Sequence, residues 1–320
     1  MAMLGRLLAA GLMVAGASVA HADNVLHVGK AVPPDFGYTV ANVGVAAGTF
    51  AQHGLQVEPI DFAGAPKMHQ AMIAGSVDIG LSGGTDLSFI AKGSPELAIA
   101  ALANAPRGFA VYARDGAGIA SIKDLKGHKV GISAEGALSD WLMRQLVREQ
   151  GWPQGSITLI GLGAPTAIAA ALRTGQIDAM FIDLTLASQL DAAHVGKTLA
   201  NFGDIVKDFH IEAIYATLDV IQHRPDDVRR FLAGWFDTIV WMRGHKDETV
   251  KILAPVTHTD PAALGGIYDQ LMPTFSRDGR FDPKALAAIG QSLSDLHLLE
   301  GRPDLAKFTT EAFLPAAPER

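Results

Sequence analysis

The chain has 320 residues, a length typical of about two domains, and 49% of its residues are hydrophobic while 18% are charged. This composition provides enough apolar surface for a large core and excludes an intrinsically disordered chain. The formal net charge is −7 and no basic tract occurs, which argues against a nucleic-acid partner, and the absence of cysteine excludes disulfides, thiolate metal sites, cysteine nucleophiles and a lipidated N-terminal cysteine.

The first 22 residues have the pattern of a secretory signal peptide. Arg6 gives a short positive region, residues 7–17 form an apolar run, and Ala20-His21-Ala22 fits the small-x-small rule for cleavage. The run is shorter than the roughly 20 residues that span a bilayer, although an uncleaved N-terminal anchor is the alternative. We therefore expect cleavage near Ala22 and an exported mature chain. Because an exported protein has no supply of ATP or NAD, we expect no cofactor.

Strand and helix patterns alternate through the next part of the chain. Pro33 and Pro34 end the first expected strand and open a loop, because proline cannot continue the hydrogen-bond ladder of a sheet. This alternation favours a mostly parallel α/β sheet. The expected strands lie at residues 24–28, 55–62, 77–81, 97–103 and 108–113, and the expected helices at residues 38–52 and 66–74 and from residue 86 onward.

A second set of alternating elements follows, and then the strand patterns disappear. Beyond about residue 221 we expect only helices, with starts at Pro225, Pro261 and Pro283, since proline is favoured at the first helical position. The strands expected in the second set lie at residues 129–133, 157–161 and 177–182, and its helices at residues 138–150, 166–173 and 184–193.

An internal echo links the two sets. Residues 71–79 (AMIAGSVDI) align with residues 171–179 (ALRTGQIDA) at an offset of 100 residues. Each copy reads as a helix, a glycine that supplies the left-handed backbone at its end, and a buried strand. A chance match of a short α/β pattern is the alternative. Two similar α/β units predict two lobes with a cleft between them, because ligands bind beyond the carboxyl ends of strands in open α/β sheets.

Residues 80–84 (GLSGG) match the G-x-S-x-G turn that presents the nucleophile of serine hydrolases, here Ser82. Such an enzyme also needs a histidine late in the chain. His258 and His297 are the candidates, but both fall in helical sequence rather than on a loop after a strand. The alternative is that these glycines let backbone N–H groups approach a ligand at a helix start.

Residues 131–137 (GISAEGA) form the equivalent turn of the second unit. Free backbone donors and the Ser133 hydroxyl suit a polar ligand group, although Ser133 as a plain helix cap is an equal alternative. The histidines have no metal-binding spacing and no phosphate-binding loop motif occurs, so we expect neither a metal site nor an ATPase.

Four stretches carry a resemblance to a known family. They are residues 48–57 (GTFAQHGLQV), 74–80 (AGSVDIG), 224–232 (RPDDVRRFL) and, most specifically, 121–131 (SIKDLKGHKVG). With these motifs the chain resembles the substrate-binding proteins of ABC importers, in the branch for nitrate, taurine, aliphatic sulfonates and thiamine-precursor pyrimidines. A eukaryotic branch that makes the thiamine pyrimidine carries a cysteine-rich run, which this chain lacks.

The resemblance implies an α/β fold of the periplasmic-binding-protein type II class, with two α/β lobes, a ligand cleft and a two-segment hinge. Beyond the signal peptide (1–22), lobe I is expected at residues 23–111 plus 216–320 and lobe II at residues 112–215. The crossings are expected near residues 111–114 and 212–217. The family also implies a periplasmic location, no catalysis and delivery of a small-molecule ligand to the membrane permease of an importer; we expect a monomer.

The family's ligand loops fall at residues 31–36, 82–85, 104–107, 133–138 and 182–184. The ligand-binding residues expected from them are Pro34, Asp35, Phe36, Ser82, Gly83, Gly84, Thr85, Asn104, Arg107, Ser133, Glu135, Gly136, Ala137, Leu138 and Asp183. The aromatic residues available to stack on a ligand are Phe36, Tyr38, Phe109 and Trp141.

The sequence leaves the ligand class open between a sulfonate, a carboxylate, an amino compound and a pyrimidine-like heterocycle. Opposed helix starts, with Lys30 and Arg107 as countercharges, suit an anion. If two or more of the nearby acids face the cleft, like-charge repulsion favours a ligand with donors instead. These acids are Asp35, Asp86, Glu135 and Asp183. The alternatives to an importer's binding protein are an exported serine hydrolase that uses Ser82 and a ligand-sensing module for a receptor.

Overall fold

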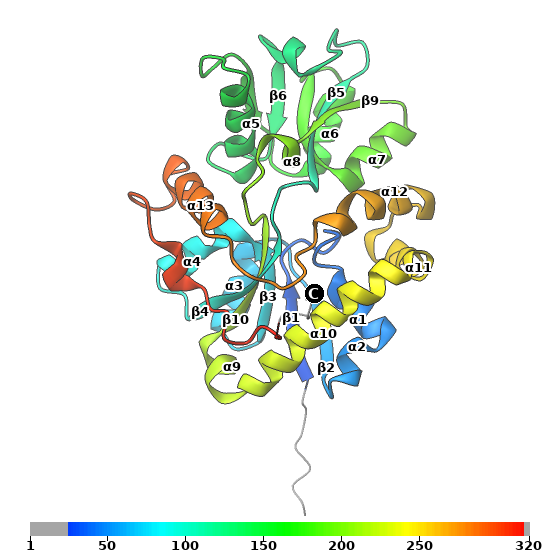
Figure 1. Cartoon of the computed structure of the whole chain (residues 1–320). Helices are drawn as coiled ribbons and strands as arrows, with labels where there is room; N and C mark the ends of the chain where they lie inside the picture. Colours follow the sequence, from blue (N-terminus) through cyan, green and yellow to red (C-terminus); the bar gives the residue numbers. More distant parts are fainter. Residues whose placement is uncertain (1–24, 317–320) are drawn as a thin grey trace, which may run out of the picture.

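Two five-stranded sheets, each flanked by helices, form two lobes that lie one above the other in the computed structural model (Figure 1). The structure describes residues 25–316, so the expected signal peptide lies outside the described residues. Within that range no helix is both long and apolar enough to cross a membrane.

The two sheets have the same pattern of strand order. In the first lobe the order is β2-β1-β3-β10-β4, and in the second it is β7-β6-β8-β5-β9. The strands of the first sheet are β1 (Val25–Lys30), β2 (Gln56–Asp61), β3 (Ile79–Gly83), β4 (Glu96–Ala103) and β10 (Glu212–Thr217). Those of the second are β5 (Phe109–Arg114), β6 (Lys129–Ile132), β7 (Thr158–Gly161), β8 (Ala179–Asp183) and β9 (Gly196–Asn201).

Each sheet contains one strand that runs against the others. β1 pairs in parallel with β2 and β3, whereas β10 is antiparallel to β3 and β4. In the second sheet β6 is parallel to β7 and β8, whereas β5 is antiparallel to β8 and β9. The reversed strands are the two that receive the chain from the other lobe. The remaining strands therefore point their carboxyl ends at the gap between the lobes, where open α/β sheets bind ligands.

The two segments in which the chain passes from one lobe to the other lie outside β5 and β10. The expected crossings at residues 111–114 and 212–217 fall within β5 and β10, which pair only with strands of the second and first sheet respectively. The chain passes between the sheets at residues 104–108 and 206–211 instead, and there the Phe209 N–H donates to the Asn104 carbonyl oxygen over 3.1 Å. We therefore propose lobe limits within these two segments rather than at residues 111–112 and 215–216.

Helices cover both faces of each sheet, and one expected helix is broken. Residues 38–52 form two helices because Gly48 adopts φ 76° between them. The helices of the first lobe are α1 (Val40–Ala47), α2 (Thr49–Gln52), α3 (Ala65–Ile73), α4 (Leu87–Ala91), α9 (Leu218–His223), α10 (Pro225–Gly244), α11 (Lys246–Thr257), α12 (Pro261–Leu271) and α13 (Pro283–Asp295). Those of the second lobe are α5 (Leu138–Glu149), α6 (Pro165–Arg173), α7 (Leu184–Ala192) and α8 (Phe202–Ile205). Short 3₁₀ helices lie at η1 (Gly84–Asp86), η2 (Ile122–Leu125), η3 (Met272–Thr274) and η4 (Leu305–Phe308).

The internal echo has a structural basis in both lobes. Gly75 and Gly175 share φ 74°. Asp78 then accepts a hydrogen bond from the His27 N–H over 2.9 Å, and Asp178 accepts one from the Lys129 N–H over 3.1 Å. Each aspartate thus binds the first part of the neighbouring strand, at the end away from the cleft. The echo is therefore a duplicated fold element that does not itself contact ligand.

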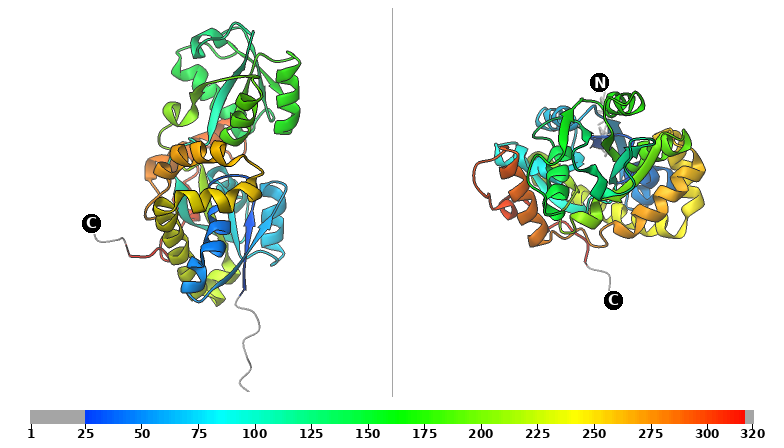
Figure 2. Two further views of the ribbon diagram at one scale, coloured as in Figure 1. Left: turned by 90° about the vertical axis from the view of Figure 1, so that its right-hand side faces the viewer. Right: turned by 90° about the horizontal axis from the view of Figure 1, so that it is seen from above.

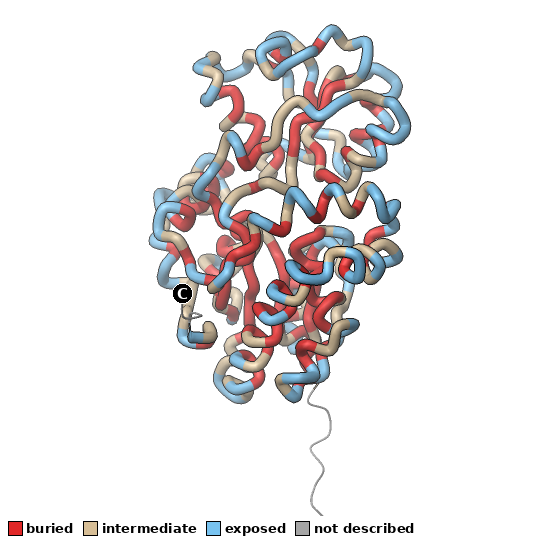
Figure 3. Tube along the Cα trace, turned by 45° about the vertical axis from the view of Figure 1, so that its right-hand side comes forward, coloured by how far each residue is buried: buried red, intermediate tan, exposed pale blue. Residues whose placement is uncertain are grey.

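The C-terminal helices reach from the first lobe to the second. α12 contacts α7, and the Trp141 indole N–H on α5 donates to Asp295 at the end of α13 over 3.2 Å. Both views in Figure 2 place these helices along the sides of the gap between the sheets. Buried residues run through both lobes in Figure 3, and the buried hydrophobic side chains of the two lobes form one continuous cluster.

The packing of η1 against the second crossing predicts an intolerant glycine. A Cβ on Gly84 would overlap the His210 carbonyl oxygen, whereas one on Gly83 would meet the Thr85 hydroxyl at 3.5 Å, an ordinary contact. Gly84→Ala should therefore lower the free energy of unfolding by about 1–3 kcal/mol through overpacking, while Gly83→Ala stays close to wild type. Urea denaturation of both variants measures this, and equal losses would contradict the close approach.

Candidate functional site

A cavity of about 530 Å³ lies between the two lobes, within the size range of small-molecule sites. The first lobe contributes the loop after β1, the end of β3 and the start of β10. The second lobe contributes the turn before α5, the start of α6, and the end of β8 with the start of α7. Residues from α11, α12 and η3, including Thr257, Ile267 and Thr274, close one side. Both lobes therefore form the walls of one compartment.

Eight of the fifteen expected ligand-binding residues line this cavity and seven do not. Those in the walls are Pro34, Asp35, Phe36, Ser82, Gly83, Ser133, Leu138 and Asp183. Those absent from the walls are Gly84, Thr85, Asn104, Arg107, Glu135, Gly136 and Ala137.

Asn104 and Arg107 belong to the hinge. The Asn104 carbonyl oxygen accepts the Phe209 N–H, and the Arg107 carbonyl oxygen accepts the Asn201 side-chain amide over 2.6 Å. The Arg107 guanidinium lies 3.1 Å from Asp204. Asn104 therefore ties the first crossing segment to the second, and Arg107 ties it to the end of β9 and to α8, so we propose a hinge role for both residues.

The turn before α5 uses its donors within the protein. The Ser133 N–H donates to the Ser139 hydroxyl over 3.1 Å, and the Gly136 N–H donates to Asp140 over 2.9 Å. The Glu135 side chain is 91% exposed. Ser133 still lines the cavity with its hydroxyl 2.7 Å from that of Ser139, but the backbone N–H groups of Ser133 and Gly136 are occupied within the protein.

Two carboxyl groups meet in the first lobe, and one of them was absent from the sequence-based set. Asp35 accepts hydrogen bonds from the N–H groups of Gly37 (2.8 Å) and Tyr38 (3.4 Å). Glu212, the first residue of β10, packs its carboxyl against Gly37, where a Cβ would overlap it. Asp35 and Glu212 are 177 positions apart, so only the return of β10 beside β3 brings them together.

Burial makes both groups weak acids, and a hydrogen bond from Glu212 offsets part of this effect on the pKa of Asp35. Burial raises the pKa of Asp35 to about 6, with the Asp183 charge adding to the rise while the backbone hydrogen bonds lower it. The pKa of Glu212 is raised well above its ordinary value. Burial is the largest cause, and the charge of Asp35 and a hydrogen bond with Asp35 add to it. The two carboxyls therefore share a proton as a pair.

A third carboxyl faces this pair from the second lobe. Asp183 ends β8 and caps α7, accepting the Leu186 N–H over 2.9 Å. Burial raises its pKa as well. The effect of its charge on Asp35 places the acids of both lobes within electrostatic reach of one another.

A fourth carboxyl, Asp86, is balanced by a buried histidine. Asp86 accepts the Ser82 hydroxyl proton and lies 3.6 Å from Nε2 of His69, whose Nδ1 is 2.7 Å from Glu96. Burial lowers the pKa of His69, but Asp86 and Glu96 outweigh this and raise it to about 9. His69 is therefore a cation at neutral pH, and Ser82 faces a carboxylate rather than a neutral imidazole that accepts its proton.

Basic side chains do not line the cavity among residues 25–316. The Lys30 ammonium, expected as a countercharge, lies 2.9 Å from Asp61 and donates to Asn42 over 2.8 Å. Arg107 pairs with Asp204 at the hinge. The expected cationic partners for an anion are therefore engaged elsewhere.

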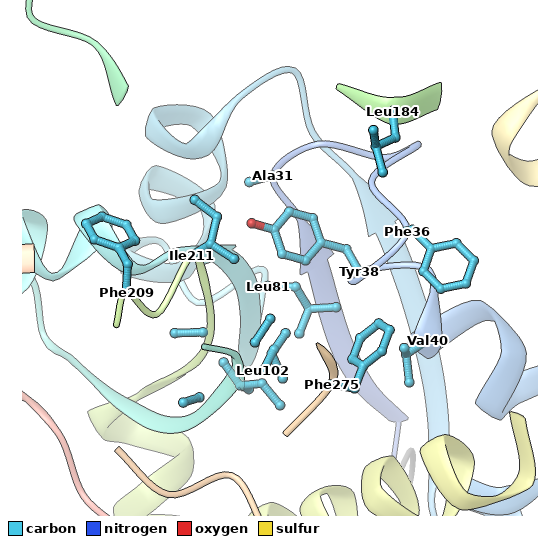
Figure 4. Close-up of a cluster of buried hydrophobic side chains, with 14 of the residues drawn as sticks. Ala31, Phe36, Tyr38, Val40, Leu81, Leu102, Leu184, Phe209, Ile211 and Phe275 are labelled. Atoms are coloured by element: carbon cyan, nitrogen blue, oxygen red, sulfur yellow. The ribbon is translucent and has the colours of Figure 1, made fainter. Parts of the chain in front are cut away.

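The remaining walls are largely apolar. Phe109 and Phe181 stack at the second-lobe side with ring centroids 5.0 Å apart and 24° between planes. Phe36, Tyr38 and Leu184 lie around the loop after β1 (Figure 4). Trp141, expected to stack on a ligand, packs on Phe209 instead and lies outside the walls. Phe181 was not among the aromatic residues expected at the ligand. It follows Ala179 and Met180 in a strand with a buried pattern, so its sequence position predicts a place in the hydrophobic core.

Comparison with known proteins gives a consistent family. The model of the family described as NMT1/THI5 like matches residues 37–249. A protein of Brucella abortus (strain 2308), provisionally named a binding protein, is 28% identical over 251 residues, 77% of this chain and 76% of its own length. A Bacillus subtilis (strain 168) protein, provisionally named an aliphatic sulfonates-binding protein, is 23% identical over 70% of this chain and 67% of its own length.

The fold also matches a solved structure. The periplasmic aliphatic sulphonate binding protein SsuA from Escherichia coli superposes with a TM-score of 0.76 at 18% identity, covering 89% of this chain and 97% of that one. At this identity the likeness establishes the two-lobed fold.

Because the cavity carboxyls are buried, we predict that their ionisation lowers the free energy of unfolding as the pH rises. Asp35 has a pKa of about 6 in the folded state against an ordinary value of 3.8. Its contribution is therefore fully present below about pH 3.8 and lost as pH rises through about 6. Asp35→Asn keeps an acceptor oxygen and removes the charge, so relative to wild type it should gain up to about 3 kcal/mol between roughly pH 4 and pH 8.

Denaturant unfolding across that pH range measures the difference. Asp247→Asn is the matched control because Asp247 is exposed at the start of α11 and lies outside both the cavity walls and the hinge. The control should follow the wild-type pH dependence. An Asp35→Asn variant that also follows it would show that burial of this carboxyl has no energetic cost.

Proposed function

The chain belongs to the NMT1/THI5-like family, and from this premise we propose that it is a binding protein that captures a small organic molecule between its lobes and delivers it to the membrane permease of an ABC importer. One observation carries the proposal: a compartment of about 530 Å³ is walled by both lobes, and the chain passes between these lobes in two adjacent segments.

The geometry supports binding by closure. Asp35 and Ser82 approach a ligand from the first lobe, and Asp183 and Phe181 approach it from the second. A ligand held by both lobes binds the closed arrangement better than the open one, and only this difference in affinity shifts the population. Moving the equilibrium from 1:99 to 99:1 takes about 5.5 kcal/mol of such difference. The paired crossing segments at Asn104 and Phe209 then serve as the hinge.

Two further statements belong to the proposal. The protein acts in the periplasm, which its resemblance to exported binding proteins and the pattern of residues 1–22 support. It carries out no chemistry on its ligand: Ser82 hydrogen-bonds to Asp86, and the imidazole of His69, on the far side of that carboxyl, is held between Asp86 and Glu96. A sensing role uses the same two lobes and differs only in the membrane partner.

Closure around a ligand predicts that a bulky residue at Ser133 blocks binding. Mass spectrometry of the molecules released by denaturing the exported protein identifies the ligand. Ser133→Trp fills part of the cavity from the second lobe, so affinity for that ligand in calorimetry should fall at least about tenfold. Ser156→Trp, in the same lobe but outside the walls, should bind like wild type. Equal affinity of the two variants would place the ligand elsewhere.

The absence of a nucleophile–base pair predicts no esterase activity that depends on Ser82. Turnover of 4-nitrophenyl acetate by wild type and by Ser82→Ala should be equal and close to the buffer rate, because no imidazole accepts the Ser82 proton. Circular dichroism confirms that the variant is folded. Turnover by wild type that Ser82→Ala abolishes would replace the binding function with a serine hydrolase.

A further inference from the structure

The cavity has an excess of negative charge at the point where the lobes meet. The Asp35–Glu212 pair in the first lobe faces Asp183 in the second, and no basic residue lines the walls within the described chain. Asp86 differs from these acids because His69 balances it. The closed compartment therefore brings carboxyls of both lobes together with backbone N–H groups as their partners and, among the described residues, no basic side chain in the walls to balance their charge.

A second observation points to a ligand at the same place. Tyr38 is only 4% exposed and lines the cavity, yet its hydroxyl has no hydrogen-bond partner among the described residues. Burial and the charges of Asp35, Glu212 and Asp86 act on this hydroxyl, so it lies among the cavity acids. In Figure 4 the hydroxyl points away from Phe275 and Val40, toward the side where Ala31, another wall residue, is drawn. Buried hydroxyls are normally hydrogen-bonded, so this one is available to a bound molecule.

The opposite half of the cavity is apolar. Phe109 and Phe181 stack there, with Leu138 and Leu184 beside them in the walls. A ligand that fits both halves has one charged end and one hydrophobic body.

We propose that the ligand is an organic cation, a protonated amine on an apolar body, whose ammonium lies between the Asp35–Glu212 pair and Asp183. This inference rests on the proposed binding function and names its ligand class. An ammonium supplies three donors for the facing carboxyls and for the Tyr38 oxygen. It also removes the repulsion between Asp35 and Asp183, so binding and closure are coupled. A sulfonate, which the Escherichia coli structure and the Bacillus relative are named for, meets three acids and no cation here.

Three probes with one body and different charges test the ligand class. They are 4-phenylbutylamine, 4-phenylbutanol and 4-phenylbutane-1-sulfonate, each titrated into the refolded, ligand-free protein up to millimolar concentration near pH 7.5, where the amine is protonated. Calorimetry should give an affinity for the amine at least about tenfold above that for the alcohol, and weaker binding still for the sulfonate.

Variants that remove the negative charges of Asp35 and Asp183 test whether these two residues cause the preference for the amine. Asp35→Asn combined with Asp183→Asn should reduce the preference for the amine over the alcohol to within about threefold, because each amide keeps one acceptor oxygen of similar shape but carries no charge. Asp247→Asn, at an exposed site outside the cavity walls and the hinge, should retain the full preference. Thermal unfolding in the absence of ligand establishes that the double variant is folded, and we expect it to be no less stable than wild type.

The outcomes separate the two proposals. Tightest binding of the sulfonate or of the alcohol would overturn the organic-cation inference and leave the binding function intact. A preference for the amine that the double variant retains would overturn the assigned position of the ammonium. No binding of any probe would contradict both proposals.

Discussion

The chain passes between the lobes twice, and this constraint determines how the rest of the molecule is arranged. A strand that receives the chain from the other lobe has to begin at the edge of its sheet that faces the gap. β5 and β10 therefore run against their neighbours, and the other strands direct their carboxyl ends into that gap. The loops that follow those ends carry Asp35, Ser82 and Asp183, so the topology alone brings side chains from both lobes into one compartment.

The cavity contains carboxyl groups from both lobes and no basic side chain among the described residues, so its charge affects how readily the lobes close. Burial makes each carboxyl costly to ionise, and the charge of Asp183 in the second lobe adds to the rise in the pKa of Asp35 in the first. Closing the lobes without a ligand brings like charges together in a medium that screens them weakly. A molecule that neutralises them therefore favours the closed arrangement. His69 illustrates the same rule inside the first lobe, where the buried carboxyls Asp86 and Glu96 hold a buried cation.

The sequence predicts the parts of this arrangement that depend on local pattern. Helix-ending glycines at positions 75 and 175 and strands with apolar periodicity identify the two α/β units, the strand ends locate Ser82 and Ser133, and the resemblance to the family adds Asp35 and Asp183. Residues defined by contacts between distant segments were predicted less well. Glu212 reaches Asp35 only through the pairing of β10 with β3, Arg107 is drawn to Asp204 by the adjacent crossings, and the exposed edge strand β9 has too little apolar pattern to be recognised.

The central claim is that a ligand held by both lobes closes them, and the distance between the lobes tests it most directly. The chain has no cysteine, so spin labels at Lys67→Cys in the first lobe and Glu135→Cys in the second, both exposed, are the only ones present. Pulsed electron paramagnetic resonance on the ligand-free protein should give a broad distance distribution. The ligand recovered from the native protein, at saturation, should narrow it and shift it to shorter distances. An unchanged distribution, with bound ligand established by calorimetry on the same sample, would contradict closure.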